Sequence, residues 1–263
     1  MTKIESLILG IIQGLTEFLP ISSSGHLELG GYFLGIETKD NLLFAIIVHG
    51  ATALSTIVVF RKSITVLLQD VFTLKRNDST TYISKIVLSA IPVGIVGIFF
   101  EEQIKELFTG NVVFVAFMLG ITGILLSATY FSKVSDGEIS FAKAFFIGVA
   151  QAIAILPGIS RSGATISTAL LFGVDREKAT QFSFLMVLIP ILGAMLLKIK
   201  DIMLNPELVS GMGFEALLIG FAAAFVTGLF ACKWMLAIVR KGKLFYFAIY
   251  CFVVGASVLI AYW

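Results

Sequence analysis

Six long apolar runs constrain the fold of this sequence more than any other feature. They cover residues 42–60, 83–100, 112–131, 182–197, 214–231 and 244–262. A helix crosses the hydrocarbon core of a bilayer with roughly 20 apolar residues, and only a helix can satisfy its own backbone hydrogen bonds there. Only 14% of the 263 residues are charged, too few for the surface of a soluble domain of this length. The sequence therefore predicts an all-α integral membrane protein.

Two further apolar stretches are interrupted in a way that predicts re-entrant hairpins. The first extends from residue 7 to residue 34 and is broken at Pro20, and the second extends from residue 145 to residue 172 and is broken at Pro157. Each arm has about a dozen residues, fewer than a full span needs. We therefore expect six full transmembrane helices and two helical hairpins, each of which enters and leaves the membrane on one side.

Lysine and arginine are distributed unevenly between the loops that this arrangement creates. Thirteen lie in the loops of one side and five in the loops of the other, while Arg161 lies within the second hairpin. Lysine and arginine are enriched in cytoplasmic loops, so the loops that carry thirteen of them are predicted to be cytoplasmic. Both chain termini then lie outside. The two hairpins then enter from opposite faces. A net charge of +2 is too small to indicate a nucleic-acid partner.

The two hairpins resemble each other in sequence. Gly10 and Gln13 match Gly148 and Gln151, and residues 22–25 match residues 160–163, both at an offset of 138 residues. An odd number of predicted crossings lies between them, so the repeat is expected to be inverted. Inverted repeats with broken helices place binding sites near the bilayer midplane in many transporters. We expect a single membrane domain, residues 1–263, with repeat halves of about 1–131 and 132–263.

The first hairpin turn carries ionisable and hydroxyl side chains at membrane depth. Its candidate site residues are Gln13, Glu17, Ser22, Ser23, Ser24 and His26. Gln13 and Glu17 are four residues apart and share one face of a helix. A carboxylate within a membrane persists when it is paired, hydrated or functional, and a wet interface is the alternative for Glu17. His26, beside three hydroxyls and near a carboxylate, is a candidate for acid–base chemistry.

The second turn places one arginine among hydroxyl groups. Its candidate site residues are Ser160, Arg161, Ser162 and Thr165. A guanidinium beside hydroxyls and the backbone N–H groups of a helix start binds anions, and phosphate satisfies several of these donors at once. The alternative is an Arg161–Glu17 ion pair that joins the two hairpins. In the empty protein both interpretations can hold.

Other polar residues are expected to have ordinary roles. Packing within a helix is the favoured interpretation of His49, although a functional role stays open. Solvated positions are expected for Glu28, Glu37, Glu101, Glu102 and Glu106, the last three in an external loop. Cys232 and Cys251 have a spacing that fits no metal motif and are expected to be buried free thiols.

The chain resembles the undecaprenyl-diphosphate phosphatase family of the bacitracin-resistance type. The resemblance rests on residues 13–26 and 157–165, on the chain length and on the repeat. The resemblance covers nearly the whole chain. It implies hydrolysis of a C55 polyprenyl diphosphate to the monophosphate and inorganic phosphate, which recycles the carrier lipid for cell-wall synthesis. It also implies a divalent cation, Mg²⁺ or Ca²⁺, and a site that opens to the outer face of the bacterial inner membrane.

The resemblance also implies roles for individual residues. Glu17, with Gln13, would contact the metal or orient the diphosphate, while Ser23 and His26 would be the nucleophile and its acid–base partner. The phosphates would be bound by Arg161 together with Ser22, Ser24, Ser160, Ser162 and Thr165. Many family members have glutamate at the position of Gln13. With one carboxylate left, a cation would be held chiefly by diphosphate oxygens and water.

Several alternatives stay open at this point. The nucleophile can be Ser23, His26 or a water molecule. A lipid flippase or secondary transporter is the alternative function, because an inverted repeat with a midplane site is a transporter feature. The partners expected are the polyprenyl diphosphate and bilayer lipid, and the sequence is compatible with a monomer or a homodimer.

Overall fold

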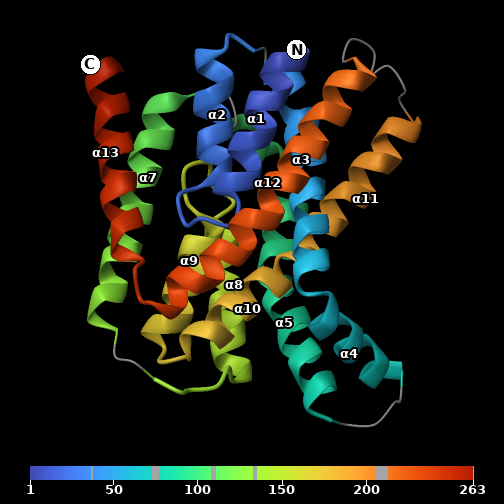
Figure 1. The fold of residues 1–263 in the computed structure, drawn as a ribbon, viewed down its shortest axis with the longest axis vertical. Helices are drawn as coiled ribbons and strands as arrows, with labels where there is room; N and C mark the ends of the chain where they lie inside the picture. The colour runs from blue at the N-terminus through green and yellow to red at the C-terminus, as the bar shows by residue number, and fades with distance from the viewer. Residues whose placement is uncertain (37, 73–76, 108–110, 133–134, 205–212, 263) are drawn as a thin grey trace.

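The chain folds into a bundle of α-helices (Figure 1). This computed structural model describes residues 1–36, 38–72, 77–107, 111–132, 135–204 and 213–262, and within them no strand forms apart from one isolated bridge, Gly137 with Val174. The helices are α1 (Lys3–Thr16), α2 (Ser23–Phe33), α3 (Thr38–Val59), α4 (Arg61–Phe72), α5 (Asp78–Phe99), α6 (Glu101–Leu107), α7 (Val112–Ala128), the short 3₁₀ helix η1 (Thr129–Phe131), α8 (Phe141–Ile153), α9 (Arg161–Leu171), α10 (Arg176–Met186), α11 (Leu188–Leu204), α12 (Phe214–Arg240) and α13 (Phe245–Tyr262).

Five helical segments of the described chain are long and apolar enough to cross a membrane. They are Asp78–Phe99, Val112–Phe131, Arg176–Leu204, Phe214–Arg240 and Phe245–Tyr262. A sixth results if α3 and α4 count as one span, although their axes differ by 79° at the break around Phe60. The prediction of an all-α integral membrane protein is thus confirmed. Helices α4 and α6 form at positions where the sequence predicted loops, so that part of the prediction is wrong.

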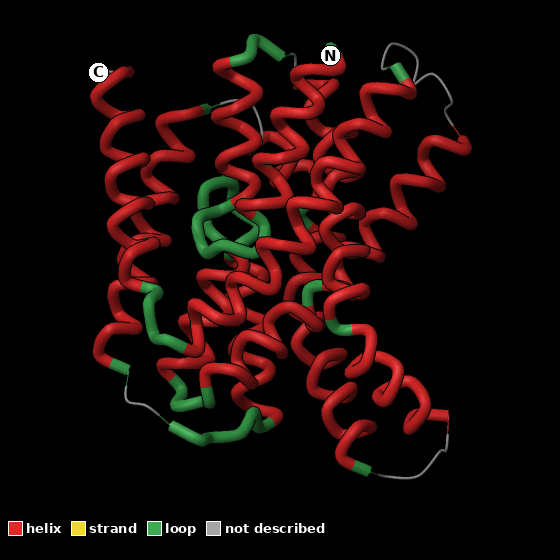
Figure 2. Tube along the Cα trace, viewed as in Figure 1, coloured by secondary structure: helices red, strands yellow, loops and turns green. Residues whose placement is uncertain are grey.

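The two interrupted stretches form pairs of short helices, α1–α2 and α8–α9, whose arms have 14, 11, 13 and 11 residues. The connecting turns meet near the centre of the molecule (Figure 2). There the Ser162 hydroxyl donates to the backbone carbonyl of Leu19 at 3.3 Å. Figure 1 places α1 and α2 toward the end of the bundle that carries both termini, while α8 rises from the opposite end. Each turn is therefore carried by short helices to the middle of the bundle.

Small residues fix each pair of short helices against one long helix. A Cβ atom added to Gly10 of α1 would lie 2.4 Å from the carbonyl oxygen of Gly220 on α12. The matching glycine of α8, Gly148, is in the same situation, because a Cβ there would lie 2.3 Å from the carbonyl oxygen of Ser89 on α5. In lipid, close backbone approach of this kind is a main source of helix association. Glycine at these two positions therefore anchors the arms that carry the turns.

The peripheral polar residues follow expectation in part. Cys232 and Cys251 are buried free thiols, and Glu102 and Glu106 are exposed, as predicted. The prediction for Glu28 is wrong, because its side chain is buried at 8% exposure. Helix α2, which carries Glu28, packs against α1, α3 and α7, so few of its side chains are exposed. Glu37 and the side chain of Glu101 lie outside the described residues.

Candidate active site

Glu17 is the residue that links the two turns. It ends α1, where its backbone N–H donates to the carbonyl of Gln13, and its side chain is 9% exposed. Its Oε2 accepts hydrogen bonds from Gln13 Nε2 at 2.9 Å and from Ser23 Oγ at 2.5 Å. Its Oε1 lies 3.8 Å from Arg161 Nη2. The ion pair between the hairpins that the sequence analysis considered is therefore present.

His49 is hydrogen-bonded within its own helix, as the favoured interpretation expected, and its ring also lies close to the Glu17 carboxylate. Its Nε2 lies 3.4 Å from Glu17 Oε2, and its Nδ1 lies 2.7 Å from the carbonyl oxygen of Ala45. Because a carbonyl oxygen only accepts, Nδ1 carries a proton, and Nε2 can donate to Glu17 only when the ring is positively charged. An ionisable residue within an apolar membrane helix is a functional candidate by default, and that signal was available in the sequence.

The serines of the two turns form matching helix caps. Ser22 Oγ accepts from the N–H of Gly25 at 3.2 Å, and Ser160 Oγ accepts from the N–H of Gly163 at 3.0 Å. The hydroxyls of Ser22 and Ser24 lie 3.3 Å apart in the first turn, and those of Ser160 and Ser162 lie 3.3 Å apart in the second. These caps start α2 and α9 at the site. The N-termini of both helices therefore add partial positive charge where an anion would bind.

Backbone geometry adds strain to the first of these turns. Ser22 has φ 68°, the one positive value of a non-glycine residue in the described part of the chain. Such a conformation costs of order 1–3 kcal/mol and persists only when surrounding contacts hold it. Here it places Ser23, the first residue of α2, with its hydroxyl on Glu17.

His26 and Thr165 make contacts outside the Glu17 cluster. The His26 ring places Nδ1 2.8 Å from the Ser22 carbonyl oxygen and Nε2 2.8 Å from the Tyr250 hydroxyl, and the two rings stack with centroids 5.6 Å apart. Thr165 Oγ1 lies 2.5 Å from Ser183 Oγ. Of the predicted site residues, the structure therefore brings Gln13, Glu17, Ser23 and Arg161 into direct contact. Tyr250, on α13, had no local signal in the sequence.

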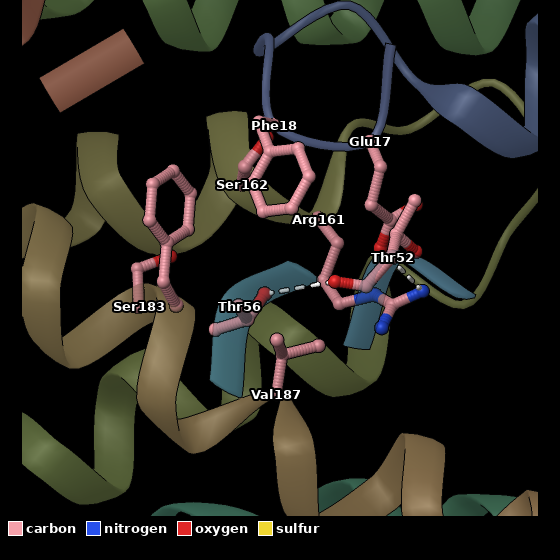
Figure 3. A pocket seen from close by; sticks show the side chains of 9 residues that line it. Glu17, Phe18, Thr52, Thr56, Arg161, Ser162, Ser183 and Val187 are labelled. Carbon is pink, nitrogen blue, oxygen red and sulfur yellow. Dashed lines mark hydrogen bonds and ion pairs between the residues drawn. The ribbon is translucent and has the colours of Figure 1, made fainter. Parts of the chain in front are cut away.

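Two cavities adjoin this cluster. The smaller, of about 20 Å³, is lined by Glu17, Arg161 and Ser162 (Figure 3), and it is the size of a water site. Figure 3 shows the Glu17 and Arg161 side chains extending toward each other beside Thr52. The larger cavity has a volume of about 340 Å³. It is lined by polar side chains from α2, α3, α8 and α9 and by apolar residues that include those of α3, α5 and α11. The polar residues are Ser24, His49, Gln151 and Arg161.

The oxygen atoms of the cluster fit a cation that is shared with a ligand better than one held by protein alone. Among the described residues no group of three or more His, Cys, Asp or Glu side chains could hold a metal ion. The Glu17 carboxylate already contacts two hydrogen-bond donors and the Arg161 guanidinium, whereas Gln13 Oε1 is buried without a hydrogen-bond partner. Carboxylate and amide oxygens are suitable ligands for Mg²⁺ or Ca²⁺, and both ions accept further oxygens from phosphate and water.

The fold and the site define an integral membrane protein with a charged, hydroxyl-rich cluster enclosed where two hairpin turns meet. Residues 6–257 match the family described as bacitracin resistance protein BacA, and the chain belongs to this family.

Relatives named undecaprenyl-diphosphatase align along the full length of the chain. The protein from Christiangramia forsetii is 51% identical over 265 residues, covering 100% of this chain and 99% of that protein. The protein from Bacteroides thetaiotaomicron is 49% identical, covering 99% of both chains. The protein from Salinibacter ruber is 41% identical, covering 97% of both chains. The family expected from the sequence motifs is therefore confirmed.

Proposed function

We propose that this chain hydrolyses undecaprenyl diphosphate to undecaprenyl phosphate and inorganic phosphate. The reaction recycles the carrier lipid of cell-wall synthesis, and this activity is the basis of bacitracin resistance. The full-length similarity to proteins named undecaprenyl-diphosphatase supports the assignment. The observation that carries it is the Glu17 cluster, in which one buried carboxylate contacts a serine hydroxyl on one oxygen and an arginine on the other.

In the proposed reaction Ser23 Oγ attacks the terminal phosphorus of the diphosphate. Its proton passes to Glu17 Oε2, which already accepts that hydroxyl at 2.5 Å. The bond between the terminal phosphorus and the bridging oxygen breaks, so polyprenyl monophosphate leaves and a phosphoserine remains. Glu17 passes that proton to the departing monophosphate and then takes a proton from a water molecule, whose oxygen attacks the phosphoserine. The bond between phosphorus and Ser23 Oγ breaks, Oγ takes the proton back from Glu17, and inorganic phosphate leaves. We assign the first proton to Glu17 rather than to His26, because the His26 ring nitrogens contact Ser22 and Tyr250.

Arg161 and the starts of α2 and α9 supply positive charge to the transferring phosphoryl group, which is the main catalytic demand of such reactions. Glu17 and Gln13 Oε1 would hold a divalent cation together with diphosphate oxygens. That cation, when bound, would neutralise phosphate charge and so lower the barrier to attack by an oxygen nucleophile.

Phosphate release from detergent-purified protein tests this proposal. We expect the wild-type protein to release one phosphate per C55 polyprenyl diphosphate in Mg²⁺ or Ca²⁺, and to lose most of this activity in excess chelator. Folding is monitored by thermal unfolding under each condition. Folded protein that releases no phosphate with either ion would favour the lipid flippase or transporter instead.

We further propose that the architecture is an inverted repeat of six spans and two re-entrant hairpins, with halves of about 1–131 and 132–263. The matched serine caps, the matched glycines Gly10 and Gly148 and the opposite approach of the hairpins support this arrangement. The excess of lysine and arginine in one set of loops supports the orientation with both termini outside. The family to which the chain belongs supports a site that opens to the outer face of the bacterial inner membrane.

Sealed vesicles of known orientation test the proposed sidedness. We expect diphosphate lipid supplied from outside to be hydrolysed by right-side-out vesicles, with phosphate appearing in the external medium. Inside-out vesicles given the lipid in the same way should release no phosphate until detergent is added, because their lumen-facing site cannot reach a diphosphate headgroup in the outer leaflet. The opposite pattern would place the site on the cytoplasmic face.

A further inference from the structure

Gln151 is a buried amide whose hydrogen-bonding capacity is unused. It lies in the last turn of α8 and is 1% exposed, yet neither its Nε2 nor its Oε1 has a hydrogen-bond partner. Such a group destabilises the folded protein, because it loses its hydrogen bonds to water without replacement. A buried polar group left in this state needs an explanation, and an absent ligand is one.

The repeat explains how this amide became free. Gln13, its match in the first hairpin, donates to Glu17 four residues later. The residue four positions after Gln151 is Ile155, which offers no acceptor on its side chain. The second hairpin therefore keeps the glutamine of the first and lacks the carboxylate that would engage it.

Gln151 faces the larger of the two cavities beside the site. This cavity of about 340 Å³ is also lined by His49 and Arg161, both of which contact Glu17. Its volume is far greater than the roughly 10–15 Å³ that a cavity needs to hold one water molecule. It can therefore accept a group the size of a diphosphate beside Ser24, the residue that follows the proposed nucleophile.

An apolar groove continues from this cavity. Ile104 and Ile155 line both the cavity and a second space of about 520 Å³ between α5 and α8. Among the residues whose side chains the structure describes, no charged one lines this second space, and its walls include Pro92, Val149 and Ile153. Gln151 is thus the polar residue of α8 in the cavity, and its α8 neighbours Val149, Ala152 and Ile153 face the groove. A ligand with a charged head and an apolar chain would place its junction near Gln151.

We propose that Gln151 binds the lipid-linked phosphate of the substrate, the one bonded to the prenyl chain, while the chain itself leaves through the groove between α5 and α8. The inference rests on the proposed phosphatase function. The terminal phosphate lies with Ser23 and Arg161, and Gln151 Nε2 donates to an oxygen of the inner phosphate. This contact is the same in substrate and product, so it governs affinity and not the chemical step.

Replacement of Gln151 by methionine tests this role, because methionine keeps the length of the side chain and removes both polar atoms. We expect KM for the C55 diphosphate to rise about tenfold with kcat nearly unchanged, as for loss of one hydrogen bond to a charged group. The dissociation constant of a polyprenyl monophosphate should rise by the same factor. Inhibition by inorganic phosphate, which has no lipid-linked phosphate, should not change.

Ser167→Ala is the matched control. Ser167 is another fully buried residue whose hydroxyl has no partner, and it lines neither the cavity nor the groove. Its replacement should leave all three constants unchanged. Gln151→Asn, which retains a shorter amide, serves as a second variant if the methionine protein does not fold, and it should give a smaller rise in KM.

Two outcomes would overturn the inference. Unchanged affinity for the monophosphate in folded Gln151→Met would reduce the amide to a structural role. Equal weakening of monophosphate and inorganic phosphate would place Gln151 at the terminal phosphate instead. Because monophosphate binding requires no turnover, a selective loss of that binding would support the inference even if the wild-type protein released no phosphate.

Discussion

Replacing Glu17 by glutamine is expected to lower phosphate release from a polyprenyl diphosphate by roughly 10²- to 10⁴-fold, the range of a lost general base. Glutamine has nearly the same shape but cannot take the Ser23 proton. It also removes the negative charge that faces Arg161 and His49. The effect should therefore fall on kcat, measured by steady-state phosphate release with saturating lipid.

The matched control is Glu215→Gln on α12, where the carboxylate is exposed and pairs with Lys3 at the surface. This variant should retain wild-type turnover. Thermal unfolding separates lost chemistry from lost structure, because Glu17→Gln leaves the Arg161 guanidinium beside a neutral amide and should also lower Tm. Near wild-type turnover in folded Glu17→Gln would remove Glu17 from the reaction.

Replacing Arg161 by lysine is expected to reduce kcat/KM by roughly 10²- to 10³-fold, comparable to the loss of one donor that stabilises transition-state charge. Lysine keeps the charge but replaces a planar fork of N–H donors with a single ammonium. Several N–H donors are needed here, because the Arg161 guanidinium must contact Glu17 and a phosphoryl group at the same time from the start of α9. Phosphate release over a range of lipid concentrations gives the constant.

Arg240→Lys provides the comparison for Arg161→Lys, since Arg240 is exposed and pairs with Glu177 away from the turns. A surface pair of this kind contributes little, so no change in kcat/KM is expected. If Arg161→Lys behaved like Arg240→Lys, the guanidinium would serve only to join the hairpins, which was the alternative considered from the sequence.

Much of the architecture could be predicted because a bilayer limits what a chain can do. Lipid provides no hydrogen-bond partners for the backbone, so each apolar run had to become a helix, and arms of about a dozen residues were too short to span. The turns at Pro20 and Pro157 followed from proline and serine, whose effects on the backbone are local. The loops were less predictable: α4 and α6 form where hydropathy indicated connections.

The motif residues of the turns were identified for the same local reason. Ser22 and Ser160 cap the helices that follow them, and Gln13 meets Glu17 across one helical turn. Each of these contacts joins residues that are at most four positions apart. Chain geometry over such distances depends only on the helix and its start, and the sequence alone determined it.

Contacts between distant segments were decided by the tertiary structure. His49 reaches Glu17 because α3 passes the end of α1, and Tyr250 reaches His26 across 224 residues of chain. Glu28 is buried because three other helices surround α2. Gln151 is buried without a partner beside a cavity whose other lining residues come from distant segments of the chain. Hydropathy determines that helices form and roughly where they end, but it carries no information about which faces meet, since lipid and an apolar helix are equally good solvents for an apolar side chain.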